Sequence, residues 1–579
     1  MTDGADILLS RELIAFQLFD WLKIGNPEER ATLLAVIDMA QRLAVDEFLP
    51  HYRQGDIEEP QLQEGQVRIL PAIRDALERY ADIGMFGASF AEEVGGLGLP
   101  SAVSLALYGN FCAANVATAA YPMLTAANAR LIATFGTPAQ AERFAIPQIE
   151  GRWFGTMCLS EPQAGSSLGD IRTRATEVGS DTLGIRYRLV GNKMWISGGD
   201  QDASENIVHL VLAKIVDESR NLPEGSKGIS LFIVPKRLPD GRRNDVSVAG
   251  LNHKLGYRGT ANCLLNFGEG EGAIGWRVGE PGQGLAQMFM MMNEARISVG
   301  MAASALAYRG YRQSIRYARE RTQGRISSAT GGPPVPIIAH ADVRHMLVRQ
   351  KVYAEGGIAL CLYCARLVDL GEEGAEMLLA LLTPIAKSWP SEFGPAANDL
   401  AIQVHGGYGY TRDFDVEQLW RDNRLNAIHE GTNGIQAIDL LGRKLLNSDG
   451  KAFTLLLEQI DTTIAKARGI SSSLVFGESL ADFWSHLAAV LDDLKGSAAT
   501  EMFDDATQFM RAFGHGIVAW LWLDQVVAST AQGSSPLDEG LTYACRYFFE
   551  SELPQAHGWL SIVAKHSDIV RAIPEGVFR

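Results

Sequence analysis

The stretch Trp153–Ser160 reads WFGTMCLS and marks the point where the character of the sequence changes. It is a short run of aromatic and apolar residues followed by a loop with Pro162 and Gly165, a pattern typical of a strand. Four similar runs follow: YRLVGNKMWIS (187–197), NIVHLVLAKIV (206–216), GISLFIVPK (228–236) and ANCLLNFGEG (261–270). Because no helix-length pattern separates them, they predict an antiparallel β-sheet or barrel rather than βαβ units.

Helical patterns lie on both sides of this β region. Apolar residues recur at helical spacing after Asn26-Pro27, and Thr137-Pro138 marks another helix start. Long helical patterns resume near residue 281 and continue to the C-terminus. The expected fold class is therefore α+β multidomain: an N-terminal α-helical domain (1–150), a central antiparallel β domain (151–280), a C-terminal α-helical bundle (281–447) and an additional α-helical domain (448–579).

The bulk composition excludes several classes of function. The chain has 579 residues, a formal net charge of −16, and 47% apolar and 21% charged residues. This is ordinary for a globular protein with more than one domain, but nucleic-acid binding is not expected, since phosphates require a basic surface. The start, MTDGADILLSREL, lacks the basic stretch and apolar core of a signal peptide. We therefore expect a cytoplasmic protein.

Two features could suggest a metal site or a membrane. Cys361 and Cys364 form a CxxC, but no second CxxC accompanies them and they lie in an apolar helical pattern. We interpret them as buried core thiols and predict no metal site. The run from Val94 to Ala129 has no charged residue, yet polar residues such as Ser104 and Asn110 interrupt it. It is interpreted as a buried helix pair rather than a transmembrane segment.

Two loops in the β region could contact a ligand. CLSEPQAGSSLGD (158–170) leaves a strand and is rich in Gly and Ser, so its backbone N–H groups could cradle anionic oxygens. In MWISGG, Trp195 stands beside Ser197 and two glycines, where its ring could pack on an aromatic cofactor. Taken alone, the first is also compatible with an ordinary turn and the second with a core tryptophan.

Two further motifs lie in the helical part that follows. RYARERTQGR (316–325) concentrates arginines in an acidic chain; it fits either a solvated helix face or a phosphate site. In QVHGGYGY (403–410), a helix C-cap explains one of the two adjacent glycines but not both. Close approach of the backbone to a ligand would explain the pair.

The stretch NAIHEGTNGIQ (426–436) places one carboxylate, Glu430, at a glycine-containing break before a helix. The acid could simply favour the positive end of the helix dipole. It could also be a general base on a loop held over a substrate. Spacing alone leaves both interpretations open.

Together, in this order, the motifs resemble the acyl-CoA dehydrogenase family of flavoproteins. The residues that carry the resemblance are CLSEPQAGSSLG, MWISGG, MNEARISVGMAASAL, RERTQGR, QVHGGYGY and IHEGTNGIQ. The resemblance covers roughly residues 30–445. The additional C-terminal unit is similar to the long branch of the family, which includes dehydrogenases of 3-methylthiopropionyl-CoA and of longer acyl-CoA thioesters.

The resemblance implies FAD as cofactor, between the β domain and the C-terminal bundle. Residues of the β domain would contact the flavin and pyrophosphate: Met157, Leu159, Ser160, Gly165, Ser166, Trp195 and Ser197. Others would reach the FAD of a neighbouring subunit: Arg321, Gln323, Gln403, Gly406 and Gly407. A homo-oligomer, dimer or tetramer, is therefore implied, and Thr432 would lie on the flavin side of the site.

The resemblance also implies the reaction, an α,β-dehydrogenation of an acyl-CoA in fatty acid β-oxidation. Glu430 falls on the family's catalytic base and would take the α-proton while flavin N5 accepts the β-hydride. Substrate contacts would come from Ser166, Arg296, His429 and Gly431. Burial against substrate and flavin is expected to raise the pKa of Glu430. The residue before the base is often Tyr in the family and is His429 here, and Ala295 stands where some relatives carry their base.

Three functions remain open on the sequence. The first is a dehydrogenase that passes electrons to an electron-transfer flavoprotein, and the second is an acyl-CoA oxidase that uses oxygen. The third is a non-catalytic flavin or acyl-CoA binding scaffold, against which the presence of Glu430 in its motif counts. In the additional domain, Trp520 and Trp522 could touch a membrane, but packing against the main body or a second subunit is the preferred interpretation.

Overall fold

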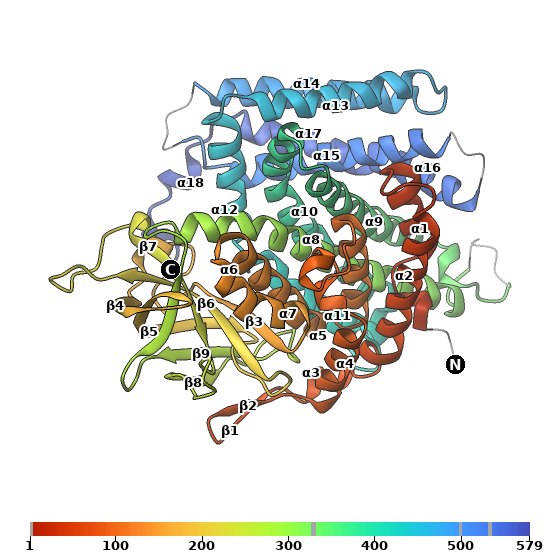
Figure 1. Cartoon of the computed structure of the whole chain (residues 1–579). Helices are drawn as coiled ribbons and strands as arrows, with labels where there is room; N and C mark the ends of the chain where they lie inside the picture. The colour runs from red at the N-terminus through yellow and green to blue at the C-terminus, as the bar shows by residue number, and fades with distance from the viewer. Residues whose placement is uncertain (1–3, 326–331, 497–500, 531–534) are drawn as a thin grey trace. The chain divides into compact units, whose positions relative to one another are not determined.

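A computed structural model describes residues 4–325, 332–496, 501–530 and 535–579, and the chain forms two compact units (Figure 1). Unit 1 comprises Met1–Asp38, Pro100–Gly109 and Arg296–Arg579, and unit 2 comprises Met39–Leu99 and Asn110–Ala295. Each unit is thus assembled from segments distant in sequence. The expected succession of helical, β and helical regions is present along the chain.

Unit 2 is built on one large sheet. Its strands are β3 (Trp153–Cys158), β4 (Arg174–Asp181), β5 (Gly184–Ser197), β6 (Asn206–Ile215), β7 (Ile229–Pro235), β8 (Val246–Leu251), β9 (Asn262–Phe267) and β10 (Ala273–Val278). The order is β10-β7-β6-β4-β5-β9-β8, with β3 on β6 and a further pairing of β10 with β5. Most pairings are antiparallel as expected, but β3 and β4 run parallel to β6.

The sequence did not reveal β4, β8 or β10; β10 is mostly buried, whereas the other two are polar. β4 is mostly exposed and β8 carries few buried side chains, so neither shows a strong apolar run. By contrast, every residue of β7 and nearly every residue of β6 is buried. A hairpin of β1 (Gln61–Gln63) and β2 (Gln66–Arg68) also lies in the region expected to be purely helical.

The helices of unit 2 pack around this sheet. They are α3 (Tyr52–Ile57), α4 (Pro71–Asp82), α6 (Pro138–Gln140) and α7 (Ile146–Ile149), together with parts of α2 (Arg30–Leu43), α5 (Ser101–Phe135) and α8 (Gly284–Glu320). Thr137 caps α6 through a capping box with Gln140 and Pro138 follows it, which confirms that start signal. One core joins the apolar face of the sheet, including Leu210 and Ile233, to Ile132 and Phe144.

The uncharged run forms the long helix α5, which bends at Asn115. The Asn115 side chain donates to the carbonyl of Phe48 and accepts from the backbone of Thr118, so the bend is hydrogen-bonded. Among the described residues α5 is the one helix long and apolar enough to cross a bilayer, and 89% of its most apolar window is buried in the protein. Burial of that kind is expected of a core helix.

Unit 1 is helical. It holds α1 (Arg11–Ala15), α9 (Ala341–Leu370), α10 (Glu373–His405), α11 (Val416–Asn423), α12 (Asn433–Ile438), α13 (Lys451–Arg468), α14 (Leu474–Leu494), α15 (Ala506–Ser529), α16 (Pro536–Tyr547), α17 (Leu553–Val563) and α18 (Ile569–Ala572). Helices α8 and α10 approach closely, since a Cβ added at Gly300 would lie 1.9 Å from the carbonyl oxygen of Ala386. Cys361 and Cys364 are fully buried in α9, as predicted.

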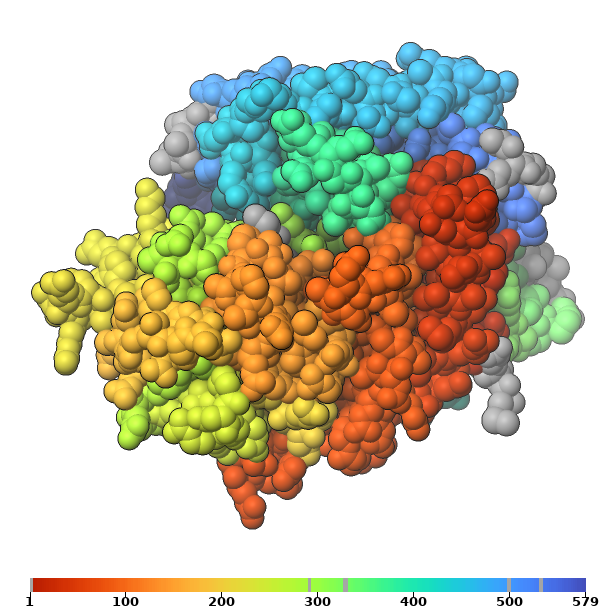
Figure 2. All heavy atoms as spheres, in the orientation of Figure 1, coloured from red at the N-terminus to blue at the C-terminus, as the bar shows by residue number. Residues whose placement is uncertain are grey.

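A segment near the N-terminus contacts helix α15 within unit 1. Gln17 donates to the side chain of Gln525 at 3.0 Å, and the Trp21 indole donates to Asp524 at 2.8 Å. Figure 2 shows the N-terminal segment in red beside the C-terminal helices in blue. The segment around Gln17 and Trp21 therefore packs against helix α15, more than 500 residues away in sequence.

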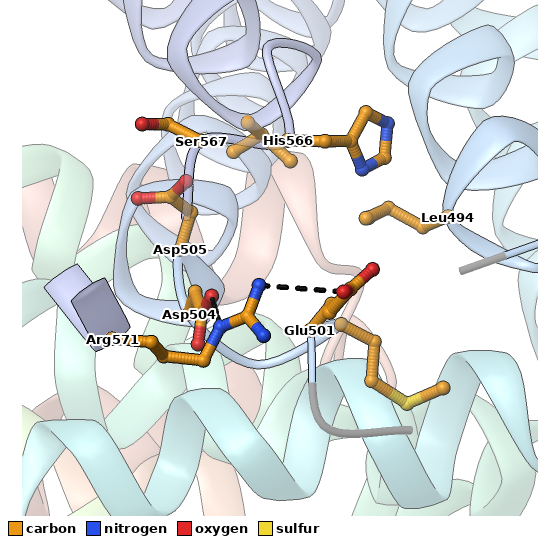
Figure 3. A pocket seen from close by; sticks show the side chains of 9 residues that line it. Leu494, Glu501, Asp504, Asp505, His566, Ser567 and Arg571 are labelled. Atoms are coloured by element: carbon orange, nitrogen blue, oxygen red, sulfur yellow. Dashed lines mark hydrogen bonds and ion pairs between the residues drawn. The ribbon is translucent and has the colours of Figure 1, made fainter. Parts of the chain in front are cut away.

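The additional domain packs on the helical bundle of the same unit. Trp520 and Trp522 are buried, and the Trp520 indole donates to Thr463 at 2.9 Å, so neither is exposed for a membrane. Near the C-terminus, Arg571 pairs with Asp504 and Glu501 beside a cavity of about 10 Å³ (Figure 3). That cavity has room for one water molecule and not for a substrate.

Candidate active site

Glu430 sits in a strained turn at the start of α12. Its φ is 54° and that of Gly431 is 89°, so two consecutive residues are left-handed. A Cβ at Gly431 would lie 2.5 Å from Gln436 Nε2, which explains why glycine is needed. The turn is held from α12, because Gln436 Nε2 donates to the Glu430 carbonyl at 3.0 Å and Thr432 caps the helix. Left-handed non-glycine residues cluster at functional sites.

The surroundings of Glu430 favour a base stronger than an ordinary carboxylate. Burial raises the pKa of Glu430 and outweighs the charges of Arg296 and Lys387, which lower it. This is the direction expected from the sequence. A carboxylate whose pKa lies closer to the working pH is better matched to proton abstraction.

Lys387 is a component of this site that sequence reasoning missed. It lies in the middle of α10 with its side chain fully buried, and its Nζ donates to Asn433 Oδ1 at 3.3 Å. Burial lowers the pKa of Lys387 to about 7, against the opposing charge of Glu430. A single lysine in an apolar helical pattern gave no signal, since the fold alone brings it beside the turn.

Arg296 also lies near Glu430. It is buried in α8, its guanidinium is 4.0 Å from the Asp439 carboxylate, and its Nε has no hydrogen-bond partner among the described residues. Asp439 is further tied to Arg443 at 2.6 Å. The structure thus places Arg296 among the acids of the Glu430 region.

His429 is neutral in this environment. Burial and the charge of Lys387 lower the pKa of His429 to about 3. Its Nε2 lies 3.1 Å from Asn426 Oδ1. The structure thus gives His429 a hydrogen-bonded neighbour within its own turn.

In unit 2, a buried ion pair closes the Gly/Ser loop after β3. Lys193 Nζ donates to Glu161 Oε1 and to the carbonyl of Leu159, both at 2.9 Å. Glu161 also accepts from the backbone N–H groups of Arg172 and Thr173. One carboxylate therefore joins both ends of the loop, and the Lys193 charge and these hydrogen bonds lower its pKa to about 2.

The candidate cofactor residues of this region surround the closed loop. Met157, Leu159 and Ser160 are half-buried at the end of β3, and the Ser160 carbonyl accepts from Met194. Gly165 and Ser166 are exposed, and the space beside the Gly165 Cα is open. Backbone and hydroxyl donors are thus displayed on a loop whose ends are fixed.

Trp195 is not a core residue. It is 59% exposed, and its φ of 67° lies in the left-handed region although it stands within β5. The register with β9 shifts here, between Lys193 and Ile196. Ser197, two residues on, accepts a hydrogen bond from Asn262 at 3.2 Å. A bulge that turns a large ring outward is a device for presenting it to a ligand.

A groove of about 560 Å³ in unit 1 brings together four more of the predicted residues, Arg321, Gln323, Gly406 and Gly407. Tyr317 and Tyr408 also line it. Nothing lies within 4 Å of a Cβ added at either glycine, so a ligand can approach the backbone closely. Gln403 is exposed two residues before the end of α10 and is not part of the lining.

Comparison with known proteins agrees with these features. The acyl-CoA dehydrogenase N-terminal, middle and C-terminal domains match residues 30–152, 156–269 and 282–446, and an acetyl-CoA dehydrogenase C-terminal-like domain matches residues 456–574. The 3-methylmercaptopropionyl-CoA dehydrogenase of Ruegeria pomeroyi is 34% identical over 502 residues, 84% of each chain.

Two solved structures share the fold over almost the whole chain. Caenorhabditis elegans ACDH-11 in complex with C11-CoA has a TM-score of 0.80 at 20% identity and covers 98% of this chain and 96% of its own. The acyl-CoA dehydrogenase of Bacillus anthracis complexed with FAD has a TM-score of 0.75 at 19% identity, with 99% and 93% covered. The chain belongs to the acyl-CoA dehydrogenase family of FAD-dependent oxidoreductases.

Proposed function

We propose that the protein dehydrogenates an acyl-CoA thioester to the trans-2-enoyl-CoA with Glu430 as the base. The observation that carries this proposal is the turn of Glu430: a half-buried carboxylate in a strained backbone, with its pKa raised and its carbonyl anchored by Gln436. Strain of this kind persists only where surrounding structure enforces it.

Glu430 would take the proton from Cα of the thioester. That proton is weakly acidic, so the carboxylate must be strong and correctly placed. Burial supplies the strength, and the fixed turn supplies the placement. Neutral Gln at this position would keep the shape and remove the base.

Arg296 and Lys387 would hold Glu430 ionised before substrate binds. Both charges lower the pKa of Glu430, opposing burial. Arg296 Nε, buried without a partner in the described structure, is a donor available to the carboxylate or to substrate. Together the two cations oppose the effect of burial and favour the deprotonated form of the base.

The residues present fit FAD. The Trp195 ring is exposed next to strand ends, the Gly165–Ser166 loop offers open backbone, and the groove at Arg321, Gly406 and Gly407 combines a cation with glycines. When bound, the flavin accepts the β-hydride of the substrate. Met157, Leu159, Ser160 and Ser197 would meet its ring. Thr432 would face its isoalloxazine side. On the FAD of a neighbouring subunit, Gln323 would reach the phosphates and Gln403 the adenosine end.

The groove supports a homo-oligomer. In the family pattern its residues serve the FAD of a neighbouring subunit, and an open glycine-lined groove with an exposed Tyr408 is suited to such sharing. Sedimentation of the FAD-loaded protein should give a dimer or tetramer, and Arg321→Ala should lower FAD content. A monomer with full FAD content would contradict the proposal that two subunits share each FAD site.

The main test is anaerobic bleaching of the bound flavin by a series of CoA thioesters. A series that includes straight chains from butyryl to palmitoyl and 3-methylthiopropionyl identifies the acyl group. At least one thioester should bleach the native protein, and Glu430→Gln should retain FAD and remain yellow. A scaffold without catalytic activity would bind thioesters without bleaching.

The electron acceptor is tested separately. We propose an electron-transfer flavoprotein, and the oxidase alternative predicts hydrogen peroxide in air without any added acceptor. Turnover with electron-transfer flavoprotein and negligible peroxide supports the dehydrogenase. Stoichiometric peroxide at the turnover rate would identify an oxidase.

A further inference from the structure

A chain of hydrogen-bonded polar side chains in unit 1 ends at the residue before Glu430. We name it the amide relay: Asn398 in α10, Asn423 at the end of α11, Asn426, and His429. The three asparagines are completely buried. The links are Asn423 Nδ2 to Asn398 Oδ1 at 2.7 Å, Asn426 Nδ2 to Asn423 Oδ1 at 2.9 Å, and His429 Nε2 with Asn426 Oδ1 at 3.1 Å.

Backbone carbonyls fix the direction of the amide relay. Asn398 Nδ2 donates to the carbonyl of Leu306 at 2.9 Å, and Asn423 Nδ2 donates to that of Ala303 at 2.9 Å. A carbonyl can only accept, so the amide nitrogen of each asparagine must face α8 and its oxygen must face away. Each oxygen then accepts from the next member of the chain.

The last link follows from the others. Asn426 uses its nitrogen toward Asn423, so its oxygen faces His429, and His429 Nε2 must carry the proton that this oxygen accepts. Because burial keeps the ring neutral, with a pKa of about 3, Nδ1 is unprotonated. The backbone carbonyls of α8 therefore set the tautomer of His429, through the hydrogen bonds of the three asparagines.

The packing makes room for this chain. A Cβ at Gly394 would lie 2.9 Å from the Ala303 carbonyl and 3.0 Å from Asn423 Nδ2, and a Cβ at Gly310 would lie 2.7 Å from Asn398 Nδ2. Glycines at both positions allow the amides to pass between tightly packed helices.

We propose that the amide relay is a positioning device: it holds His429 as the Nε2–H tautomer and so fixes the turn that carries Glu430. This inference rests on the proposed function of Glu430. The turn is strained, and a strained backbone needs anchors on both sides. Gln436 anchors it from α12 and the amide relay anchors it from α8, α10 and α11.

A matched pair of variants tests the link. His429→Gln keeps an N–H donor for Asn426, whereas His429→Leu removes it and leaves a buried oxygen unsatisfied. Because His429 is also a predicted substrate contact, the two variants are compared with each other at saturating thioester. His429→Leu should reduce flavin in a single turnover more slowly than His429→Gln, on the order of tenfold or more, with FAD content retained in both, since misplacement of a base costs rate. A native rate in His429→Leu would overturn the positioning role.

Nitrogen NMR of histidine-labelled protein tests the tautomer without any activity. The signal lost in His429→Gln identifies His429, which should be protonated at Nε2 alone at neutral pH. Protonation at Nδ1 alone, or at both nitrogens, would overturn the assignment. If none of the thioesters bleaches the flavin of the native protein, the proposed function fails. The NMR measurement still decides the tautomer of His429 in that case.

Two asparagine variants complete the test. Asn426→Asp keeps the shape but offers His429 a carboxylate, which should produce the doubly protonated ring and slow flavin reduction. Asn244→Asp is the control: Asn244 is also buried and donates to backbone carbonyls, but it lies in unit 2 and outside the candidate site. The control should lower the melting temperature and leave the reduction rate and the His429 signal unchanged. An unaltered ring and rate in Asn426→Asp would contradict the relay.

Discussion

Glu430 should limit the stability of the protein as well as supply its activity. Its folded pKa is raised above the ordinary value of 4.5. Between the two values the native state holds a proton that the unfolded state has lost, so the free energy of unfolding falls as pH rises through this window. Glu430→Gln has no such loss, and it should be more stable than the native protein by roughly 0.5–2 kcal/mol at neutral pH.

Thermal unfolding at about pH 5 and about pH 8 measures this effect. The stability advantage of Glu430→Gln should be larger at the higher pH. The same variant should reduce flavin more slowly by about 10²- to 10⁴-fold, the usual contribution of a general base. If Glu430→Gln and the native protein have the same melting temperature at each of the two pH values, the pKa of Glu430 is not raised in the folded state.

Lys387→Met should move the pH profile of flavin reduction. The charge of Lys387 lowers the pKa of Glu430, so its removal should raise that pKa and shift the acid limb of the rate to higher pH. Lys351→Met is the matched control, since Lys351 lies in α9 and pairs with Glu355 at 2.6 Å. An acid limb that stays in place in Lys387→Met would show that the two groups do not interact.

At the scale of single residues, sequence motifs located Glu430, Trp195 and the loop glycines, because each stands in a local pattern. Lys387, Asn398 and Asn423 stand in none, and Asn426 lies in the stretch around Glu430 without a role that the sequence predicted. The first three become neighbours of the turn only through the packing of α8, α10 and α11. Likewise, exposure of Trp195 depends on a register shift between two strands, which its neighbours in sequence do not encode.

At the scale of an element, the Lys193–Glu161 pair should control the loop after β3. Glu161→Gln leaves a fully buried lysine without its counter-charge, which typically costs about 3–5 kcal/mol. Both the melting temperature and the FAD content should fall. The double variant Glu161→Gln/Lys193→Met should recover part of the stability but not the FAD content, because the loop ends stay untied. Equal stability of Glu161→Gln and native protein would contradict the burial of this pair.

The contact of α8 with α10 gives a second element-scale prediction. Gly300→Ala would place a methyl group 1.9 Å from the Ala386 carbonyl, and separating the helices should cost about 1–3 kcal/mol. Gly558→Ala, in α17 with nothing within 4 Å of the new Cβ, should be neutral or stabilise by about 0.5–1 kcal/mol. Chemical denaturation measures both. A neutral Gly300→Ala would mean that the helices separate without cost.

Among elements, the sequence predicted those with strong periodicity. The buried strands β3, β5, β6, β7 and β9 and the long helices were found. β4, β8 and the β1–β2 hairpin were missed, because exposed strands carry polar residues and obtain their stability from their neighbours. The buried strand β10 was also missed, although its sequence AIGWRV is apolar. The parallel pairing of β3 with β6 also has no local signal in the sequence, because it depends on how the other strands of the sheet are arranged.

At the scale of the whole molecule, the additional domain should be inseparable from the bundle. Trp389 and Phe393 of α10 pack against His515 and Trp559, and Tyr353 donates to the buried Glu552 at 2.6 Å. A chain ending near residue 448 would expose these groups, so it should aggregate in size-exclusion chromatography. Intact protein should not pellet with liposomes. A soluble truncated chain with a native melting temperature would show an independent appendage.

The contact between the N-terminal segment and helix α15 has a consequence for biosynthesis. The bond from Trp21 to Asp524 joins residues 503 positions apart, so the N-terminal segment leaves the ribosome well before its partner exists. At ordinary rates of translation the wait is about 25–100 s. During that time the apolar surfaces of Leu13, Ile14 and Phe19, buried in the finished protein, stay uncovered. The nascent chain should therefore depend on holding chaperones until termination.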